Sequence, residues 1–231
     1  MTLTNKKRIL CFHDVLDSDI FESRLLLCKK LGFQFISLAK LLDNKTAGPA
    51  LAVTFDDGYQ SVYQNALPIL RKLHIPATFF ITNDFIGLKE DALKSFLKNN
   101  LLRSSYREPM SWEEVGKIAS DPLFEIGAHT ASHPRLNDKY PKELAEKEII
   151  EAGDNLEKKI SKKIRYFAFP FGDSDSAGKA ARSLVRTRYE AAFSIIPGKI
   201  SGNETDTSFL PRHSLDPERN ILVWLFHLLF L

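Results

Sequence analysis

Short segments that are apolar at consecutive positions recur along the chain, separated by stretches with helical spacing. Strands of this kind are typical of parallel sheets that are covered by helices on their faces. The sequence therefore predicts an α/β fold, and with seven or eight such segments we expect a distorted, closed or nearly closed (β/α) barrel. The expected strands are residues 9–12, 33–37, 51–55, 77–82, 124–127, 167–169, 191–195 and 209–210.

Signals for helix ends lie between these strands. Residues 21–31 have helical spacing and precede Gly32, which suits the left-handed position that follows many helices. Residues 59–73 also carry apolar side chains at helical spacing. A capping-box pattern at 111–114 opens another helix, and Pro141 is expected at the first position of a long helix that ends near residue 160.

The size and charge of the chain limit the alternatives. The chain has 231 residues, 44% of them hydrophobic, and no linker or repeat divides it, so a single domain is expected. Its formal charge is +3, from 32 basic and 29 acidic residues. No basic face is interleaved with aromatic residues, and we therefore expect no nucleic-acid partner.

The two cysteines, Cys11 and Cys28, do not form a disulfide framework, and a reducing compartment is compatible with them. The N-terminal residues lead into a short apolar run and lack the longer apolar stretch of a secretory signal. On this sequence we expect a cytoplasmic location, with secretion or envelope association as the alternative.

The last residues, Ile221–Leu231, are almost entirely apolar. Eleven residues are too few to span a bilayer, which needs about 20. A terminal helix that packs on the barrel is the favoured interpretation. Peripheral membrane or partner contact through 221–231 and a truncated or frameshifted chain end are the alternatives.

Two adjacent carboxylates, Asp56 and Asp57, follow the predicted strand 51–55 and precede Gly58 and Tyr59. An Asp-Gly pair also occurs in ordinary turns. Adjacent side chains at a strand end point to different sides, however, so one carboxylate can bind a metal while the other accepts a proton.

Two histidines, His129 and His133, follow the predicted strand 124–127. They converge on one point if the segment coils into a turn. Imidazole suits zinc, cobalt or nickel, and two histidines with one carboxylate leave open positions for water and substrate. A structural role for each histidine is the alternative.

Three further segments complete the pattern. Residues 167–172 end in Pro170, Phe171 and Gly172, which can form either a turn or an apolar groove wall for a sugar ring. His13 follows the strand 9–12, and His213 follows 209–210. All five groups of residues lie directly after a predicted parallel strand, the end at which barrel sites are built. A shared site explains this agreement better than five coincidences.

The strings Thr-Phe-Asp-Asp-Gly and His-Thr-x-x-His, followed by aromatic-Pro-aromatic-Gly, resemble the polysaccharide deacetylase family, also called NodB-homology domains or carbohydrate esterase family 4. The resemblance runs from about residue 8 to 216, which leaves 217–231 as an apolar C-terminal helix. It implies a divalent metal, most simply zinc, with cobalt, nickel or manganese as alternatives. It also implies hydrolytic removal of an acetyl group.

The family pattern assigns roles to individual residues of this chain. Asp56 matches the catalytic base, and Pro170, Phe171 and Gly172 match the groove motif, with Tyr59 beside them as a candidate backbone donor to the oxyanion. The metal ligands match Asp57, His129 and His133.

Two departures from the family pattern concern the surroundings of this site. Many members carry an arginine where this chain has Ala168, and many have a tryptophan after the groove motif that is absent here. Arg165 or Arg212 could replace the arginine. The general acid is usually a late-strand histidine, which would be His213. In the branch that includes poly-N-acetylglucosamine deacetylases, it precedes the Asp-Asp motif, and His13 is preferred on that ground.

The expected function is metal-dependent removal of acetyl groups from N-acetylated or O-acetylated sugars in a polysaccharide or glycan precursor. The expected partner is therefore an acetylated glycan. One alternative is an amidohydrolase of the same fold that acts on a non-sugar amide. Another is a degenerate carbohydrate-binding protein without catalysis.

Overall fold

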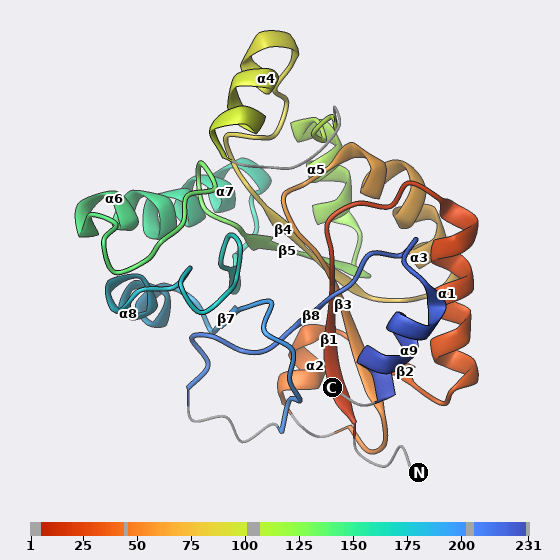
Figure 1. The fold of residues 1–231 in the computed structure, drawn as a ribbon. Coiled ribbons are helices and arrows are strands. Elements are labelled where there is room, and N and C mark those ends of the chain that lie inside the picture. Colours follow the sequence, from red (N-terminus) through yellow and green to blue (C-terminus); the bar gives the residue numbers. More distant parts are fainter. Residues whose placement is uncertain (1–5, 44–45, 101–106, 202–205, 230–231) are drawn as a thin grey trace.

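The computed structural model describes residues 6–43, 46–100, 107–201 and 206–229. In this part of the chain, eight strands form one sheet in which every strand pairing is parallel (Figure 1). The order is β7–β6–β5–β4–β3–β1–β8, and β2 pairs with β3 outside this path. The strands are β1 (Lys7–Phe12), β2 (Gln34–Phe35), β3 (Ala50–Phe55), β4 (Ala77–Ile81), β5 (Phe124–Ala128), β6 (Tyr166–Ala168), β7 (Ala191–Phe193) and β8 (His213–Ser214).

The two ends of this sheet approach each other through residues 210–214. Leu210 forms a parallel bridge with Phe193 at the end of β7. Three residues later, His213 pairs with Leu10 of β1. The sheet is therefore curled into a distorted barrel, which confirms the predicted fold class. The carboxyl ends of β1, β3, β5 and β6 share one rim of this barrel, because all of them are parallel.

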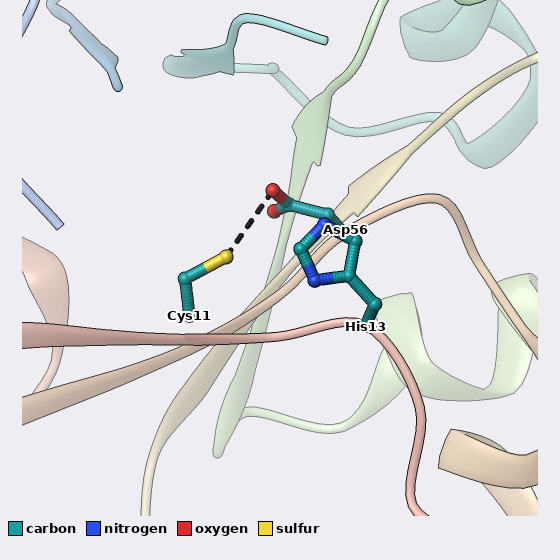
Figure 2. A group of neighbouring side chains, drawn as sticks. All are labelled: Cys11, His13 and Asp56. Carbon is teal, nitrogen blue, oxygen red and sulfur yellow. Dashed lines mark hydrogen bonds between the residues drawn. The ribbon is translucent and has the colours of Figure 1, made fainter. Parts of the chain in front are cut away.

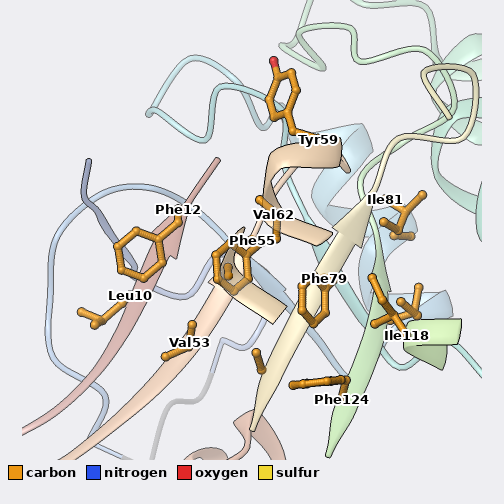
Figure 3. Close-up of a cluster of buried hydrophobic side chains, with 14 of the residues drawn as sticks. Leu10, Phe12, Val53, Phe55, Tyr59, Val62, Phe79, Ile81, Ile118 and Phe124 are labelled. Carbon is orange, nitrogen blue, oxygen red and sulfur yellow. The ribbon is translucent and has the colours of Figure 1, made fainter. Parts of the chain in front are cut away.

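The strands separate two apolar clusters, since consecutive residues of a strand point to opposite faces. The larger cluster contains Leu10, Phe55 and Phe79 and packs under the helices (Figure 3). The rings of Phe55 and Phe79 stack with centroids 5.2 Å apart. Ile9 and Phe80 belong to the smaller cluster on the other face. Burial on both faces explains why these strands are apolar at consecutive positions.

The helices cover the outside of the sheet (Figure 1). Gly32 follows the first helix with φ 88°, and the capping box predicted at residues 111–114 is present. The helical segments are α1 (Ser18–Lys30), α2 (Leu38–Leu42), η1 (Val62–Ala66), α3 (Leu67–Leu73), α4 (Glu90–Asn99), α5 (Trp112–Ser120), α6 (Lys142–Glu146), η2 (Lys147–Glu151), α7 (Ala152–Ile160), α8 (Lys179–Arg188) and α9 (Ile221–Leu229), where η1 and η2 are π-helical.

Several boundaries differ from those predicted. The expected strand 209–210 is wrong, because Leu210 forms only a single bridge and the regular pairing begins at His213. The expected strand 33–37 is reduced to β2, which pairs with the first two residues of β3. Pro141 caps α6 instead of occupying its first turn. The helices α2, α4 and α8 were not predicted.

The helix α9 packs on the barrel, as expected for the described residues 221–229. Trp224 and Leu228 have no exposed surface. The Trp224 ring stacks on Phe12 with centroids 5.8 Å apart, and its Nε1 donates to the Asp216 carbonyl at 2.9 Å. Leu222 and Phe226 point outward, with 70% and 51% of their surface exposed. Over the described part of the chain, none of the helices combines the length and apolar character needed to cross a membrane.

Candidate active site

Three polar side chains from two strand ends meet on the barrel rim. Asp57 follows β3, and His129 and His133 follow β5. The Nε2 atom of His129 is 3.4 Å from Asp57 Oδ1, and that of His133 is 3.2 Å from the same oxygen. All three residues are at most 4% exposed. The structure thus brings together the three residues that the sequence singled out as metal ligands.

A neighbouring carbonyl orients the His129 ring, and a side chain holds the backbone of His133. His129 Nδ1 is 2.8 Å from the Ala168 carbonyl oxygen. A carbonyl can only accept, so Nδ1 carries a proton, and Nε2 is the nitrogen that faces Asp57. The backbone N–H of His133 donates to Thr130 Oγ1 at 3.0 Å. A carbonyl behind a ligating histidine is a common support for metal binding.

The turn between the two histidines is held by a buried acid that the sequence did not reveal. One carboxylate oxygen of Glu148, in η2, accepts from the backbone N–H groups of Ala131 and Ser132, both at 2.9 Å. Its other oxygen accepts from Ser132 Oγ at 2.6 Å. Glu148 is 8% exposed. In the sequence, Glu148 lies in a charged helical stretch and resembles an ordinary solvent-exposed glutamate. No local pattern therefore predicts its buried contacts.

The rim loops contain unusual backbone conformations. Asp57, Thr130, His133 and Phe171 have φ values of 71°, 69°, 65° and 62°. These values lie in the left-handed region, which non-glycine residues rarely adopt. Such conformations cost free energy and persist where surrounding contacts impose them. Their concentration in the three loops around the Asp57 cluster marks this rim as a constrained site.

The donor set fits a divalent cation. Both Asp57 oxygens are buried and accept no hydrogen bond in the part of the chain that the structure describes. Burial would raise the pKa of Asp57, but the facing His133 and His129 hold it well below its usual value. A buried anionic carboxylate that faces two imidazole nitrogens needs positive charge beside it, which ring protons or a bound cation can supply. These three side chains could therefore hold a metal ion.

Asp56 is paired with Arg212 and lies close enough to His129 for the two groups to affect each other's pKa. Arg212 Nη1 donates to Asp56 Oδ1 and Nη2 donates to Oδ2, both at 2.7 Å. Burial would raise the pKa of Asp56, but the charge and hydrogen bonds of Arg212, together with the nearby His129 and His13, hold this pKa at about 2. Asp56 is therefore an ionised carboxylate in a fully buried position.

The structure distinguishes the two arginines that could replace the missing family arginine. Arg212 lies in the segment that closes the barrel, and its Nε donates to the Ser194 carbonyl at 2.8 Å. Arg165 instead pairs with Glu190 on the surface, at 2.7 Å. The arginine beside Asp56 thus comes from a late segment, while Ala168 contributes only its backbone carbonyl to the site.

The two candidate acids are also separated. His13, at the end of β1, offers a ring nitrogen within 4.8 Å of the Asp56 carboxylate and the Cys11 sulfur (Figure 2). His213 is fully buried, its Nε2 is 2.8 Å from the Gly198 carbonyl, and its ring lies against His227 of α9. Burial lowers the pKa of His213 to about 4. His213 is therefore outside the group that surrounds Asp56, because its strand position turns it toward α9.

Of the residues expected in the groove, Phe171 lies beside the cluster. The centroid of the Phe171 ring is 5.0 Å from that of His133 and 4.4 Å from the guanidinium carbon of Arg135. Gly172 has φ 58°, and a Cβ there would lie 2.7 Å from the backbone nitrogen of residue 195. Pro170 is buried beneath them, and Tyr59 is 3% exposed and packs edge-on against an aromatic ring at position 85. Phe171 is thus the half-buried apolar surface next to the candidate metal ligands.

Comparisons with known proteins point to one family. A family model described as polysaccharide deacetylase matches residues 43–189. The chain is 22% identical over 212 residues to the poly-beta-1,6-N-acetyl-D-glucosamine N-deacetylase of Escherichia coli (strain K12), a match that covers 78% of this chain and 30% of that protein. The protein of the same name from Staphylococcus epidermidis is 28% identical over 163 residues, 66% of this chain and 52% of the relative. The chain thus spans about half the length, or less, of these curated relatives.

Solved structures share the fold. IcaB from Ammonifex degensii superposes with a TM-score of 0.77 at 23% identity, over 96% of this chain and 97% of that one. A polysaccharide deacetylase from Bacillus cereus gives a TM-score of 0.77 at 20% identity, over 99% of this chain and 70% of that one. The family model covers more than half of the chain and includes the Asp56–Asp57 pair and both histidines of the cluster. The chain therefore belongs to the polysaccharide deacetylase family.

Proposed function

We propose that this chain is a metal-dependent hydrolase that removes acetyl groups from N-acetylated sugars of a glycan or glycan precursor. One observation carries the proposal. The two adjacent carboxylates have opposite surroundings, since Asp57 faces two imidazoles and Asp56 is held by a guanidinium. One carboxylate is thereby suited to bind a cation and the other to accept a proton.

The metal would be held by Asp57, His129 and His133. Zinc is the proposed ion, because two imidazoles and one carboxylate match its usual ligands at sites that keep an open position. Cobalt, nickel and manganese accept similar ligands. When bound, the ion would polarise the acetyl carbonyl and lower the pKa of the attacking water.

Asp56 is proposed to take the proton of that water as the water attacks the acetyl carbon. Arg212 occupies one lone pair of each carboxylate oxygen; the second lone pair of Oδ1 stays available, whereas that of Oδ2 faces the Cys11 thiol at 3.3 Å. A pKa of about 2 keeps Asp56 ionised, and it also lowers the driving force for proton transfer. Arg212 therefore fixes the position and charge of the base at some cost to its basicity.

His13 is proposed as the general acid. Its ring lies within 4.8 Å of Asp56 and lines a cavity of about 210 Å³ together with Asp14, Arg107 and Ser214. Protonated His13 would donate to the sugar nitrogen as the bond between this nitrogen and the carbonyl carbon breaks. Acetate and an amine result, and Asp56 and His13 exchange their protons with solvent.

The proposed substrate follows from the apolar rim and from the relatives. Phe171 offers an aromatic face next to His133, and a sugar ring with an acetyl methyl group suits such a surface. The relatives' names give poly-beta-1,6-N-acetyl-D-glucosamine as the substrate of those proteins. We extend this substrate class to the present chain, with residues 8–216 as a single catalytic domain that α9 follows.

The test is acetate release from N-acetylglucosamine oligomers by the protein with zinc, compared with its Asp56→Asn and Asp57→Asn variants. Asp56→Asn is expected to retain metal and lose at least about 100-fold in turnover, because it lacks the base. Asp57→Asn is expected to lose the metal itself, measured by elemental analysis after dialysis.

Four outcomes contradict the proposal. Near-normal turnover of Asp56→Asn would remove Asp56 as the base. Acetate release from O-acetylated but not N-acetylated sugars would mean that the chain cleaves an ester bond and not an amide bond. Hydrolysis of non-sugar amides alone would mean that the substrate is not a sugar. Metal binding without hydrolysis of any acylated amine or ester would leave a carbohydrate-binding protein.

A further inference from the structure

Cys11 lies next to the proposed base but has no place in the proposed reaction. It comes from β1, two residues before His13, so both side chains are on the inner side of the strand. Its Sγ is 3.3 Å from Asp56 Oδ2, and its side chain is fully buried (Figure 2). Both Asp56 oxygens already accept from Arg212, so Asp56 does not need this thiol to be satisfied.

We infer that Cys11, His13 and Asp56 form a second metal site, distinct from the Asp57 cluster, which takes a soft or borderline divalent cation such as zinc or cadmium. Occupation of this site would block turnover, because the cation would bind the proposed base and the proposed acid together. The inhibitory consequence rests on the proposed function, whereas the binding itself does not.

The geometry needs only a small adjustment. Ligand atoms of a tetrahedral zinc site with bonds of about 2.0–2.3 Å are roughly 3.3–3.8 Å apart. The sulfur and carboxylate oxygen already have this spacing, at 3.3 Å. One ligand atom from each of the three side chains lies within 4.8 Å of the others. The His13 nitrogen therefore needs to approach by no more than about 1 Å. His13 is half-buried at a strand end, where its ring has room to turn.

The ligand types also fit. Thiolate, imidazole and carboxylate together are common in sites for zinc, and thiolate favours softer ions over magnesium or calcium. The thiol donates to Asp56 in the metal-free protein, and a cation would replace this proton between the sulfur and the oxygen. The lone pair of Oδ2 that now faces the thiol would then face the cation.

The charges make this site the weaker of the two. Arg212 is fully buried and shares the Asp56 carboxylate, so a cation there meets a neighbouring positive charge. No arginine pairs with Asp57 in the described part of the chain. Metal should therefore fill the Asp57 cluster first. A cation can reach the second site through the His13 cavity, whose wall includes Asp14, Asp216 and Glu218.

The experiment titrates the metal-free protein with cadmium and follows thiolate-to-metal absorption in the ultraviolet, a readout that requires no activity. The wild type should bind two equivalents per chain, and the absorption should rise with the second. Cys11→Ser should lose this absorption and bind the second equivalent at least about tenfold more weakly. Cys28→Ser is the matched control, because Cys28 is the other buried thiol and lies on α1.

Inhibition by zinc provides the second arm of the experiment. The acetate release of each variant in excess zinc is compared with its own acetate release at one equivalent of zinc. Excess zinc should lower acetate release by the wild type and Cys28→Ser, while Cys11→Ser should resist it. Uptake of only one equivalent by the wild type overturns the inference without any variant. Unchanged absorption in both Cys11→Ser and Cys11→Ala does so as well. If no substrate releases acetate, the proposed function fails, and the cadmium titration still decides the second site.

Discussion

Arg212 and Asp56 are 156 residues apart in the sequence and form two parallel N–H···O bonds of 2.7 Å in the interior of the barrel. Both side chains are at most 1% exposed. The strand segment that closes the barrel therefore also supplies the partner of the proposed base. Closure of the fold and placement of the base depend on the same residue.

Replacement of Arg212 by methionine should affect both stability and turnover. It leaves the Asp56 carboxylate buried without its partner, which costs about 3–5 kcal/mol in comparable buried pairs. Turnover should fall by at least about 100-fold, since the base is neither charged nor oriented as before. Urea unfolding measures the stability, and acetate release measures the turnover. Arg212→Lys should recover only part of the lost stability and turnover, because lysine cannot donate in the same bidentate way.

Arg165→Met is the matched control for Arg212→Met. Arg165 forms its ion pair with Glu190 on the surface. Surface pairs of this kind contribute about 0–1 kcal/mol. This variant should unfold close to the wild type and keep its turnover. Equal losses in Arg165→Met and Arg212→Met would show that the Asp56 pair has no special role.

The two histidines should differ in activity. His13→Ala should reduce turnover by about 100-fold or more, because the leaving nitrogen loses its proton donor. His213→Gln should keep most of the turnover, since glutamine can still donate to the Gly198 carbonyl that His213 contacts. Steady-state acetate release at saturating metal measures both. A large loss in His213→Gln beside a small one in His13→Ala would reverse the assignment.

His213 should also make stability depend on pH. Its pKa is about 4 in the folded chain, because burial disfavours the charged ring, and about 6.5 when unfolded. Between these values the unfolded state binds more protons, so stability is full above the unfolded pKa and falls as the pH drops toward the folded one. The loss reaches up to about 3 kcal/mol for this one group.

Urea unfolding at pH 7, 5.5 and 4 tests this dependence in the wild type and His213→Gln. The slope against pH should flatten in the variant. Burial also lowers the pKa of His227, so a smaller slope in the same direction should remain. An unchanged slope in His213→Gln would mean that His213 is accessible to protons in the folded chain.

The strand ends were the part of this site that the sequence could predict. A strand buried on both faces is visible as a consecutive apolar run, and the Asp56–Asp57 pair and the two histidines follow such runs directly. Parallel pairing then places them on one rim without further information. The fold class and the convergence of Asp57, His129 and His133 follow from this local pattern.

The partners of these residues could not be predicted in the same way. Glu148 and Cys11 act through contacts between distant segments, and neither has a local pattern that differs from a surface glutamate or a core cysteine. For Arg212, the sequence left Arg165 as an equal candidate, since the choice depends on which segment closes the barrel. His213 also follows an apolar run in the sequence, but in the structure its side chain lies against His227 of α9 and not on the rim. Whether a side chain at a strand end is buried, and which way it points, depends on how the barrel closes.

Glu148→Ala should weaken metal binding at a distance. Three bonds from this carboxylate hold the turn between His129 and His133. Loss of such outer supports typically costs about 10- to 100-fold in metal affinity. Competition with a chromophoric chelator measures the zinc affinity. Glu151→Ala is the control, because Glu151 is exposed on the same helical turn and should leave the affinity unchanged. Equal affinities in the two variants would show that the turn keeps its shape without Glu148.

The helix α9 should behave as part of the core on one face only. Trp224 is a fully buried ring that stacks on Phe12. Truncations of such rings to alanine cost about 3–5 kcal/mol, and Trp224→Ala should do the same. Leu222 lies on the opposite side of the helix and is 70% exposed. Its replacement by alanine should change the free energy of unfolding by no more than about 0.5 kcal/mol.

Urea unfolding of Trp224→Ala and Leu222→Ala measures this difference. A small cost for Trp224→Ala would mean that the helix is detached in solution. A large cost would tie α9 to the strand that carries the proposed acid, because Phe12, on which the Trp224 ring stacks, immediately precedes His13.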